Sequence, residues 1–211
     1  MSNYFEIDWD WFHKQVKEAK ETHDTGFSLI NRGLTEIPIE IFEIESLTSL
    51  DLRWNRLKTI SPEISKLINL DDLQMDSNQI ETLPKSFGEL INLKQLHLDR
   101  NEFTSIPSAI FKLKNLMCLS LDFNQIQELP ADICQLRKLE WLSLGDNKLK
   151  ELPEELFELT NLEDLFFEDN QLQKISESVC KLTNLDFIGL YDNPIKKIPD
   201  CIYKIVEFNN L

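Results

Sequence analysis

A histidine, a serine and two aspartates recur at one fixed spacing and could in principle hydrolyse an acyl bond. Ser120 follows His97 by 23 residues, and Asp122 follows Asp99 by the same interval. A histidine that accepts the proton of a serine hydroxyl, with a carboxylate orienting its ring, is the usual chemistry of such a group. These residues can catalyse such a reaction only if the fold encloses their side chains and supplies an oxyanion hole.

Metal and phosphate sites have weaker support. No Cys/His spacing resembles a zinc site, and the chain contains neither GxxxxGK nor GxGxxG, the loops that cradle phosphates. Aspartates at the repeated spacing offer the oxygen ligands that calcium prefers, but no loop wraps around them. We therefore expect no cofactor and no metal, and the sequence leaves open whether the aspartates bind a cation.

The 23-residue spacing extends over nearly the whole chain. Seven leucines open the same phrase, which reads LxxLxLxxNxLxxLPxxIxxLxN: Leu47, Leu70, Leu93, Leu116, Leu139, Leu162 and Leu185. A period between about 20 and 50 residues is typical of a solenoid, in which each unit buries its apolar face against its neighbours. The 211 residues are therefore expected to form one elongated body.

The apolar pattern of each unit predicts its local shape. Leu96 and Leu98 alternate with polar residues, which indicates a short strand with both leucines inside. Pro107 lacks a backbone donor and fixes φ, so the return segment is predicted to be a short helical or 3-10 turn. An asparagine such as Asn101 recurs after each strand, where its amide can bond backbone groups. Successive strands then lie parallel, about 4.8 Å apart.

This phrase resembles the 23-residue class of leucine-rich repeats, which is found in intracellular Ras-scaffold proteins, plant Ras-group proteins and many bacterial proteins. The resemblance implies an α/β fold, a right-handed leucine-rich-repeat solenoid or horseshoe. Its parallel β-sheet lines the concave face, and short helical or 3-10 turns form the convex face. The resemblance covers residues 24–211, as eight units and a truncated ninth strand that starts at Phe208. It implies a fold and leaves the ligand open.

Residues 1–23 are predicted to form a helix that caps the first unit, because a solenoid otherwise exposes its core at both ends. Asp8 stands where an N-cap is expected. Apolar side chains follow at helical spacing: Trp9, Phe12, Val16 and Ala19. A docking helix for a partner is the alternative, supported only by Trp11 and Phe5, which lie off this stripe. At the other end, the ninth strand could pair with a second copy, giving a homodimer.

The formal net charge of −15 bears on the partner. Nucleic-acid binding depends on clustered lysine and arginine, so we expect no nucleic-acid partner, and an anionic membrane surface is disfavoured for the same reason. No segment is apolar and long enough to insert into a membrane. A protein or peptide with basic and hydrophobic groups is the natural complement, unless the charge only keeps an elongated protein soluble.

The cysteines and the N-terminus bear on the compartment. Cys134 and Cys180 occupy one repeat position two units apart, about 10 Å, which is beyond disulfide reach. Cys180 and Cys201 lie in adjacent units, so this pairing stays open. Secreted leucine-rich repeat proteins typically carry cysteine-rich caps, and from this sequence we expect neither such caps nor a signal peptide. A cytoplasmic protein is favoured, and a secreted effector without a classical signal peptide is the alternative.

Outward strand positions carry the candidate binding residues, because folding dictates the inward ones. Trp141, Phe166, Phe187 and Tyr191 fall on three adjacent strands, with Phe123 one unit earlier. Large exposed aromatics typically mark an interface. The alternative is that these rings only stack on one another and stiffen the sheet.

A neighbouring position is acidic in several units, with Asp76, Asp99 and Asp122 in line and Glu168 further along. A basic peptide could neutralise these carboxylates, or solvent could screen their repulsion. Trp54 lies on the same face. The predicted partner-binding set is Trp141, Phe166, Phe187, Tyr191, Phe123, Asp99, Asp122, Glu168 and Trp54.

The open sheet argues against catalysis by the His97 and Ser120 group, since nothing in the sequence excludes water or supplies an oxyanion hole. The sequence therefore predicts a non-catalytic protein–protein interaction module, of the kind that serves as a signalling scaffold, which binds its partner on an acidic, aromatic-containing concave face. A recognition domain of a larger signalling enzyme and a bacterial effector or regulator are the alternatives.

Overall fold

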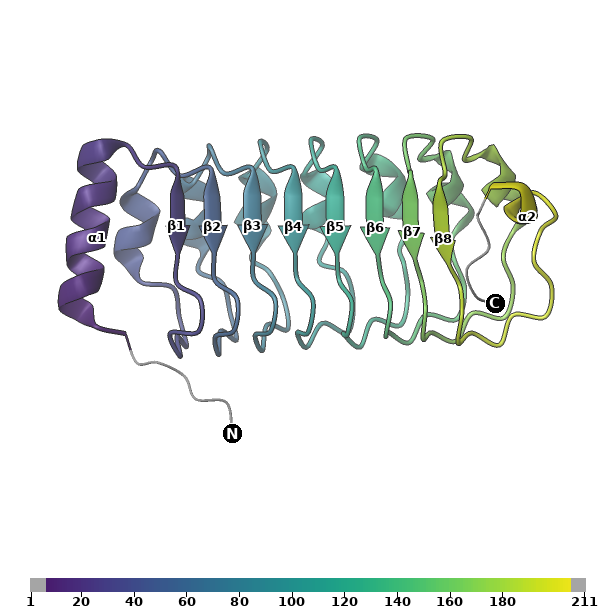
Figure 1. The fold of residues 1–211 in the computed structure, drawn as a ribbon, viewed down its shortest axis with the longest axis horizontal. Helices are drawn as coiled ribbons and strands as arrows, with labels where there is room; N and C mark the ends of the chain where they lie inside the picture. The colour runs from purple at the N-terminus through teal and green to yellow at the C-terminus, as the bar shows by residue number, and fades with distance from the viewer. Residues whose placement is uncertain (1–6, 206–211) are drawn as a thin grey trace.

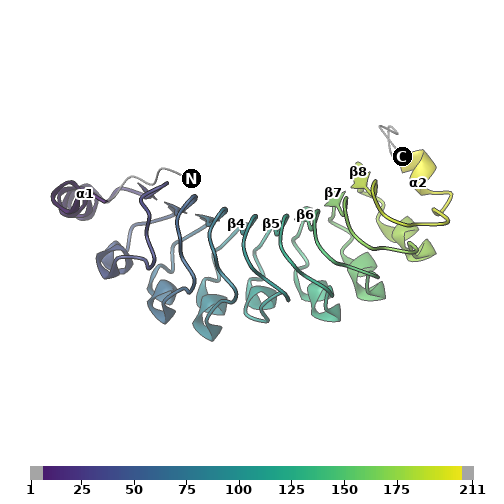
Figure 2. The same cartoon turned by 90° about the horizontal axis from the view of Figure 1, so that it is seen from below.

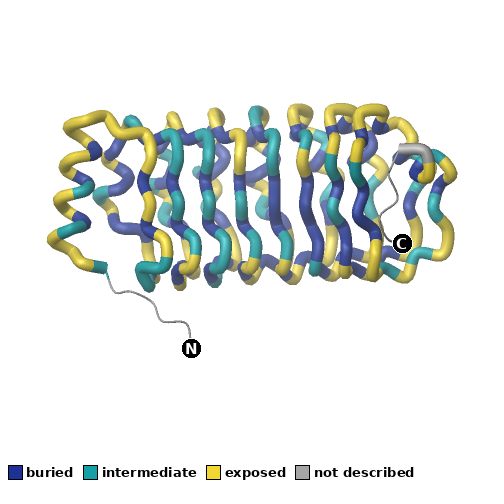
Figure 3. Tube along the Cα trace, in the orientation of Figure 1, coloured by how far each residue is buried: buried dark blue, intermediate teal, exposed yellow. Residues whose placement is uncertain are grey.

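Leucines at alternate positions produce eight three-residue strands, which pair in parallel and in sequence order to form one sheet (Figure 1). The strands are β1 (Gly26–Ser28), β2 (Ser49–Asp51), β3 (Asp72–Gln74), β4 (Gln95–His97), β5 (Cys118–Ser120), β6 (Trp141–Ser143), β7 (Asp164–Phe166) and β8 (Phe187–Gly189). Residues 23 apart face each other, as Leu73 faces Leu96 and Leu96 faces Leu119. The middle residue of every strand is buried, so the predicted repeat register is confirmed (Figure 3).

The return segments form the predicted 3-10 helices on the outer side of an arc whose inner side is the sheet (Figure 2). They are η1 (Ile39–Glu43), η2 (Pro62–Lys66), η3 (Lys85–Glu89), η4 (Ile110–Lys112), η5 (Ala131–Gln135), η6 (Glu154–Glu158) and η7 (Glu177–Lys181). Pro84, Pro130 and Pro153 immediately precede η3, η5 and η6, with φ of −67°, −67° and −71°. Each proline ends the extended segment and sets the φ from which the helix starts.

The repeated asparagine holds each unit to the one before it. Asn101 donates from Nδ2 to the carbonyl oxygens of Met75 (3.0 Å) and Leu98 (3.1 Å), and its Oδ1 accepts from the backbone N–H of Ile80 (3.0 Å). Only 7% of Asn101 is exposed. The predicted structural role is confirmed, because these bonds satisfy backbone groups that would otherwise be buried without partners.

The N-terminal cap is the helix α1 (Trp9–Thr22), as predicted. Asp8 is its N-cap, with Oδ1 accepting from the backbone N–H of Trp11 at 3.0 Å. Phe12, Val16 and Ala19 are buried, and the rings of Phe12 and Phe27 lie edge to face at 6.2 Å. The helix therefore closes the N-terminal end of the core.

The computed structural model describes residues 7–205, with side chains through Tyr203, so Phe5 and the predicted ninth strand from Phe208 lie outside the described residues. Near the C-terminal end, a disulfide joins Cys180 and Cys201, whose Cα atoms are 5.7 Å apart, just before the short helix α2 (Ile202–Ile205). Cys118 and Cys134 are free. Within the described part of the chain, no helix has the length and apolar character needed to cross a membrane.

Candidate functional site

Three aromatic side chains form a stack on the concave face, which we call the aromatic row: Trp141, Phe166 and Phe187. The ring centroids of Trp141 and Phe166 are 4.5 Å apart, and those of Phe166 and Phe187 are 4.8 Å apart. Trp141 is 39% exposed, and the other two are half-buried. The rings thus support one another and still present apolar surface to solvent.

The strand register explains how these rings meet. Trp141 and Phe187 both face Asp164, from opposite sides, whereas Phe166 lies between Ser143 and Gly189. The small side chains beside Phe166 provide no packing partner, so its ring contacts the aromatics of the neighbouring position instead. The two sequence interpretations of these residues, mutual stacking and exposure, therefore both describe the row.

Tyr191 and Phe123 lie on the same face but make other contacts. Tyr191 is 45% exposed, and its pKa is raised chiefly by the negative charge of Glu168. Phe123 is 43% exposed, and the guanidinium of Arg100 lies 3.8 Å from its ring centroid, a cation–π contact. The structure therefore brings together three of the six aromatics in the predicted partner-binding set.

The aspartates in line form a hydrogen-bonded ladder, which we call the aspartate ladder: Asp76, Asp99 and Asp122. Asp76 Oδ1 accepts from the backbone N–H of Asp99 at 2.9 Å, and Asp99 Oδ1 accepts from that of Asp122 at 2.8 Å. Asp122 Oδ1 accepts from the backbone N–H of Gly145 at 2.7 Å. Each carboxylate thus holds the next unit, a structural role that the sequence analysis missed.

Serine hydroxyls support the same ladder. Ser120 Oγ donates to Asp99 Oδ1, and Ser143 Oγ donates to Asp122 Oδ1, both at 2.6 Å. Each serine lies 21 residues after its aspartate, a spacing that is visible in the sequence. The proton of Ser120 is therefore directed at a carboxylate, and no hydrogen bond among the described residues joins Ser120 to His97 on the adjacent strand.

Two carboxyl groups of the ladder, those of Asp76 and Asp122, are in an environment that favours the protonated acid. Burial raises the pKa of Asp122 to about 6, and the negative charge of Asp99 adds to this shift, while the bonds from Ser143 and Gly145 oppose it. Burial is also the main cause of the raised pKa of Asp76. Ionisation of Asp76 and Asp122 is therefore sensitive to pH and to any cation that approaches the face.

Glu168 is buried, with 8% of its surface exposed. A Cβ atom at Gly189 would lie 1.7 Å from Glu168 Oε1, and one at Gly145 would lie 3.6 Å from Oε2. Gly189 therefore makes room for this carboxyl group, whereas a Cβ at Gly145 would only be in ordinary contact with it. Burial is the main cause of the raised pKa of Glu168. Its placement beneath the surface differs from the outward position that the sequence suggested.

Two rows of carboxylates that the sequence analysis did not select flank the aromatic row. The leading acidic row comprises Glu140, Glu163 and Asp186, each one residue before a strand. The trailing acidic row comprises Asp146, Asp169 and Asp192. Four of these six side chains are exposed and Glu140 and Asp146 are half-buried. None of the six forms an ion pair with a residue in the described part of the chain. The sequence could have indicated both rows, because two repeat positions are acidic in each of the last three units.

The eighth residue of every unit has a left-handed backbone conformation, with φ between 50° and 61°. Asparagine and aspartate tolerate this region, whereas bulky residues are disfavoured there. Trp54 (φ 61°) and Phe123 (φ 54°) are therefore unusual occupants. Trp54 is 56% exposed and lies on the turn after β2, away from the aromatic row.

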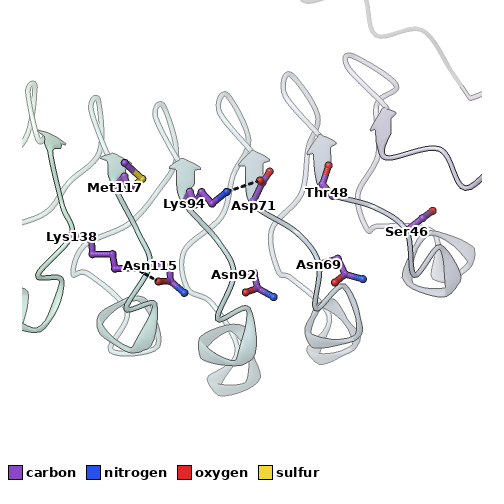
Figure 4. Close-up of a pocket in the computed structure, with 9 residues that line it drawn as sticks. All are labelled: Ser46, Thr48, Asn69, Asp71, Asn92, Lys94, Asn115, Met117 and Lys138. Carbon is purple, nitrogen blue, oxygen red and sulfur yellow. Dashed lines mark hydrogen bonds and ion pairs between the residues drawn. The ribbon is translucent and has the colours of Figure 1, made fainter.

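A second surface is a groove of about 480 Å³ along the side of the solenoid (Figure 4). Asn92 and Asn115 in its wall donate to the backbone carbonyls of the preceding unit at 2.8 Å. Lys94 pairs with Asp71 at 3.2 Å, and Lys138 Nζ donates to Asn115 at 2.7 Å. Its polar groups already have partners, so it offers less to a ligand than the concave face. Among the described residues, no cluster of His, Cys, Asp or Glu is arranged to hold a metal ion.

The repeat pattern has counterparts among known proteins. A family model described as leucine rich repeat matches three overlapping stretches, residues 45–102, 91–149 and 137–195. A comparison with curated proteins gives no match.

Solved structures of similar fold come from bacteria and from a plant. A leucine-rich repeat protein of Leptospira interrogans is 34% identical, with a TM-score of 0.87; the match covers 93% of this chain and 51% of that one. Internalin C2 of Listeria monocytogenes is 27% identical, with a TM-score of 0.74, over 82% of this chain and 74% of that one. This chain therefore spans about half the length of the Leptospira protein.

The plant structure is the leucine-rich repeat ectodomain of a membrane receptor kinase from Arabidopsis thaliana, in complex with Casparian strip integrity factor 2. It is 30% identical to this chain, with a TM-score of 0.60, and the match covers 79% of this chain and 24% of that one. In this plant protein, the same architecture is seen together with a bound partner.

Proposed function

Because the chain belongs to the leucine-rich repeat family, we propose that it is a non-catalytic interaction module whose concave face binds a protein or peptide. The leucine-rich repeat fold is a common protein-interaction module. The observation that carries the proposal for this face is the aromatic row, in which Trp141 is 39% exposed while its ring packs at a tilt against that of Phe166.

The stacked rings suit a binding site for two reasons. They present apolar surface that a partner can bury, at roughly 25 cal/mol for each Å² removed from water. They also hold one another in place, so less side-chain freedom is lost when a partner binds. Exposed aromatic anchors of this kind supply most of the energy in many interfaces.

The partner is proposed to carry basic as well as hydrophobic groups. The chain has a formal net charge of −15, and an acidic surface attracts a basic partner and speeds its encounter. A second copy of the chain, paired at the C-terminal edge of the sheet, stays a prediction, which a measurement of size in solution tests.

The cellular compartment is a separate question. Cytoplasmic residence stays a prediction from the sequence, and the disulfide between Cys180 and Cys201 opposes it, since such bonds persist in oxidising compartments. Thiol labelling of the protein in its own cells decides between the cytoplasm and an oxidising compartment. Labelled Cys180 and Cys201 favour the cytoplasm, and protected thiols favour an oxidising compartment.

The test of the binding face is affinity capture with the wild-type chain and with Trp141→Ala/Phe166→Ala, followed by mass spectrometry. Loss of two aromatic anchors is expected to weaken capture at least about tenfold. The matched control is Ile68→Ala/Ile91→Ala, which removes two exposed apolar side chains (56% and 59%) from the turns after η2 and η3. Equal capture by all three proteins, each with an unchanged unfolding curve, would refute the proposed face.

A further inference from the structure

At the strand positions that carry the aromatic row and in the two acidic rows beside it, every charged side chain is acidic. The leading and trailing acidic rows lie on either side of it, and no lysine or arginine occupies the outward strand positions of the last three units. The pKa of Asp164, which lies between Trp141 and Phe187, is raised first by burial and then by Asp186 and Glu163. These carboxylates are therefore close enough to act on the surface where a partner would lie.

The carboxylates that the sequence analysis selected are already engaged. Asp99 and Asp122 accept hydrogen bonds from the next unit, and Glu168 is buried against Gly189. A cation that approaches the face thus meets the two acidic rows first. Their side chains form no ion pair with the described residues, so a partner can pair with them without breaking a contact.

We infer that the occupant of this face is an extended basic segment of a protein, with a run of consecutive arginine or lysine residues that crosses β6, β7 and β8 over the aromatic row. This inference rests on the proposed function, and it names the chemistry of the partner. Aromatic ring faces attract cations, and the aliphatic stems of arginine and lysine cover apolar surface while their charged ends stay in water.

The geometry sets the length of that run. Three adjacent strands span about 10 Å, and an extended chain rises about 3.3 Å per residue, so about four residues cross the face. Successive side chains of an extended segment point to opposite sides. Consecutive basic residues would therefore reach the leading and the trailing acidic row in turn, which separated ones would not.

Arginine fits better than lysine at the row itself. Its planar guanidinium can lie flat on the ring of Trp141 and still donate to a carboxylate, whereas the lysine ammonium is a compact, strongly hydrated charge. The structure already contains this type of contact on the same face, where Arg100 lies 3.8 Å from the ring centroid of Phe123.

The experiment uses the full chain and a fluorescein-labelled synthetic peptide in which about four consecutive arginines cross the face, flanked by glycine and serine. Fluorescence anisotropy gives its affinity at several salt concentrations. A second peptide has the same composition with the arginines separated by glycine and serine. The consecutive peptide is expected to bind at least about fivefold more tightly than the dispersed one, with a lysine version between them.

Two protein variants with the same change in net charge locate the contact. Glu140→Gln/Glu163→Gln/Asp186→Asn neutralises the leading acidic row. This variant is expected to bind the peptide with consecutive arginines about tenfold more weakly, and its affinity should depend less on salt concentration. Glu89→Gln/Glu102→Gln/Glu128→Gln neutralises exposed carboxylates outside the strand positions and is expected to change affinity less than about twofold.

Equal weakening by the two triple variants, or equal affinity for the two arginine peptides, would overturn the inference, because either result means attraction by net charge alone. Those results leave the proposed function standing if capture still depends on Trp141 and Phe166. Conversely, capture that ignores Trp141 and Phe166 defeats the proposed function, whatever the peptides do.

Discussion

On strands β2 to β4 the outward charges are mostly paired within the protein, whereas on β6 to β8 they are left to solvent. In the N-terminal region, Arg53 Nη2 lies 2.7 Å from Asp51 Oδ2, and Lys94 Nζ lies 3.2 Å from Asp71 Oδ2. In the C-terminal region, none of the six carboxylates of the leading and trailing acidic rows pairs with a described residue. In this C-terminal region, three aromatic rings pack against one another between the leading and the trailing acidic row.

The difference lies entirely in the outward residues. Both regions have three-residue strands, the same 23-residue register and the same left-handed eighth position. The framework therefore leaves the surface residues free to vary. In the C-terminal region these residues form fewer ion pairs with one another than in the N-terminal region. Solvent-facing acids beside exposed rings are what an unbound recognition surface would have, which is why the comparison supports the proposed function.

The largest effect tests whether the framework is equivalent in the two regions. Leu73 in β3 and Leu165 in β7 are both fully buried at the middle of a strand. Leu73→Ala and Leu165→Ala should each lower the free energy of unfolding by about 2–5 kcal/mol, because each removes a buried side chain and leaves a cavity. Urea denaturation measures both. A loss of unfolding free energy in only one of the two variants would mean that the two frameworks differ in more than their surfaces.

A smaller effect separates two kinds of carboxylate, the ladder residue Asp122 after β5 and the ion-paired Asp51 in β2, by the sign of its change in stability at pH 8. In the folded chain the pKa of Asp122 is about 6, because burial raises it from its usual value of 3.8. Between these pH values the folded state binds more protons than the unfolded state, so stability falls as pH rises through the window. We expect Asp122→Asn to unfold like the wild type at low pH and to be more stable by about 1–2 kcal/mol at pH 8.

The matched variant is Asp51→Asn in the N-terminal region, where the carboxylate pairs with Arg53. Its removal should lower stability at pH 8 by up to about 1 kcal/mol, the usual worth of an exposed ion pair. Chemical denaturation at several pH values measures both proteins. The same sign of effect at pH 8 in the two variants would contradict the assignment of a stabilising ion pair to Asp51 and of a raised pKa to Asp122.

Much of this could be predicted from the sequence, and the rest depended on contacts between units. The strands, the 3-10 helices, the asparagine bonds and α1 follow from residues that repeat, because each repeated position meets the same surroundings. The burial of Glu168 depends on a single exception, the glycine at position 189, where any Cβ would collide with its carboxyl group. Repeat averaging hides such exceptions.

Two further features could not be predicted from the sequence. The aspartate ladder joins Asp99 to Ser120 and to the backbone of Asp122, and a residue pattern alone reads such aspartates as repelling charges. The disulfide between Cys180 and Cys201 involves a segment after the last complete unit, where the register no longer fixes distances, so the sequence left it open. The rings of Trp141, Phe166 and Phe187 meet, whereas Phe123 contacts Arg100 instead.

The smallest predicted effect concerns two exposed aromatics at left-handed positions, Trp54 after β2 and Phe123 after β5. Trp54→Asn places at φ 61° the residue type that the preceding unit has in Asn31, at φ 55°. We expect the variant to be more stable by about 0.5–1 kcal/mol, because asparagine tolerates this conformation better than tryptophan.

Phe123→Asn relieves the same strain, at φ 54°, but also removes the cation–π contact with Arg100. Because that contact contributes about 0.5–1 kcal/mol at an exposed site, the net change should be close to zero. Thermal unfolding with calorimetry compares the two variants. A stabilised Trp54→Asn that also captures less partner would extend the binding surface to the N-terminal region, since an aromatic held there against its backbone preference would then have a function. A stabilised variant with undiminished capture would confine binding to the C-terminal region, and a destabilised one would mean that Trp54 makes packing contacts that outweigh its strain.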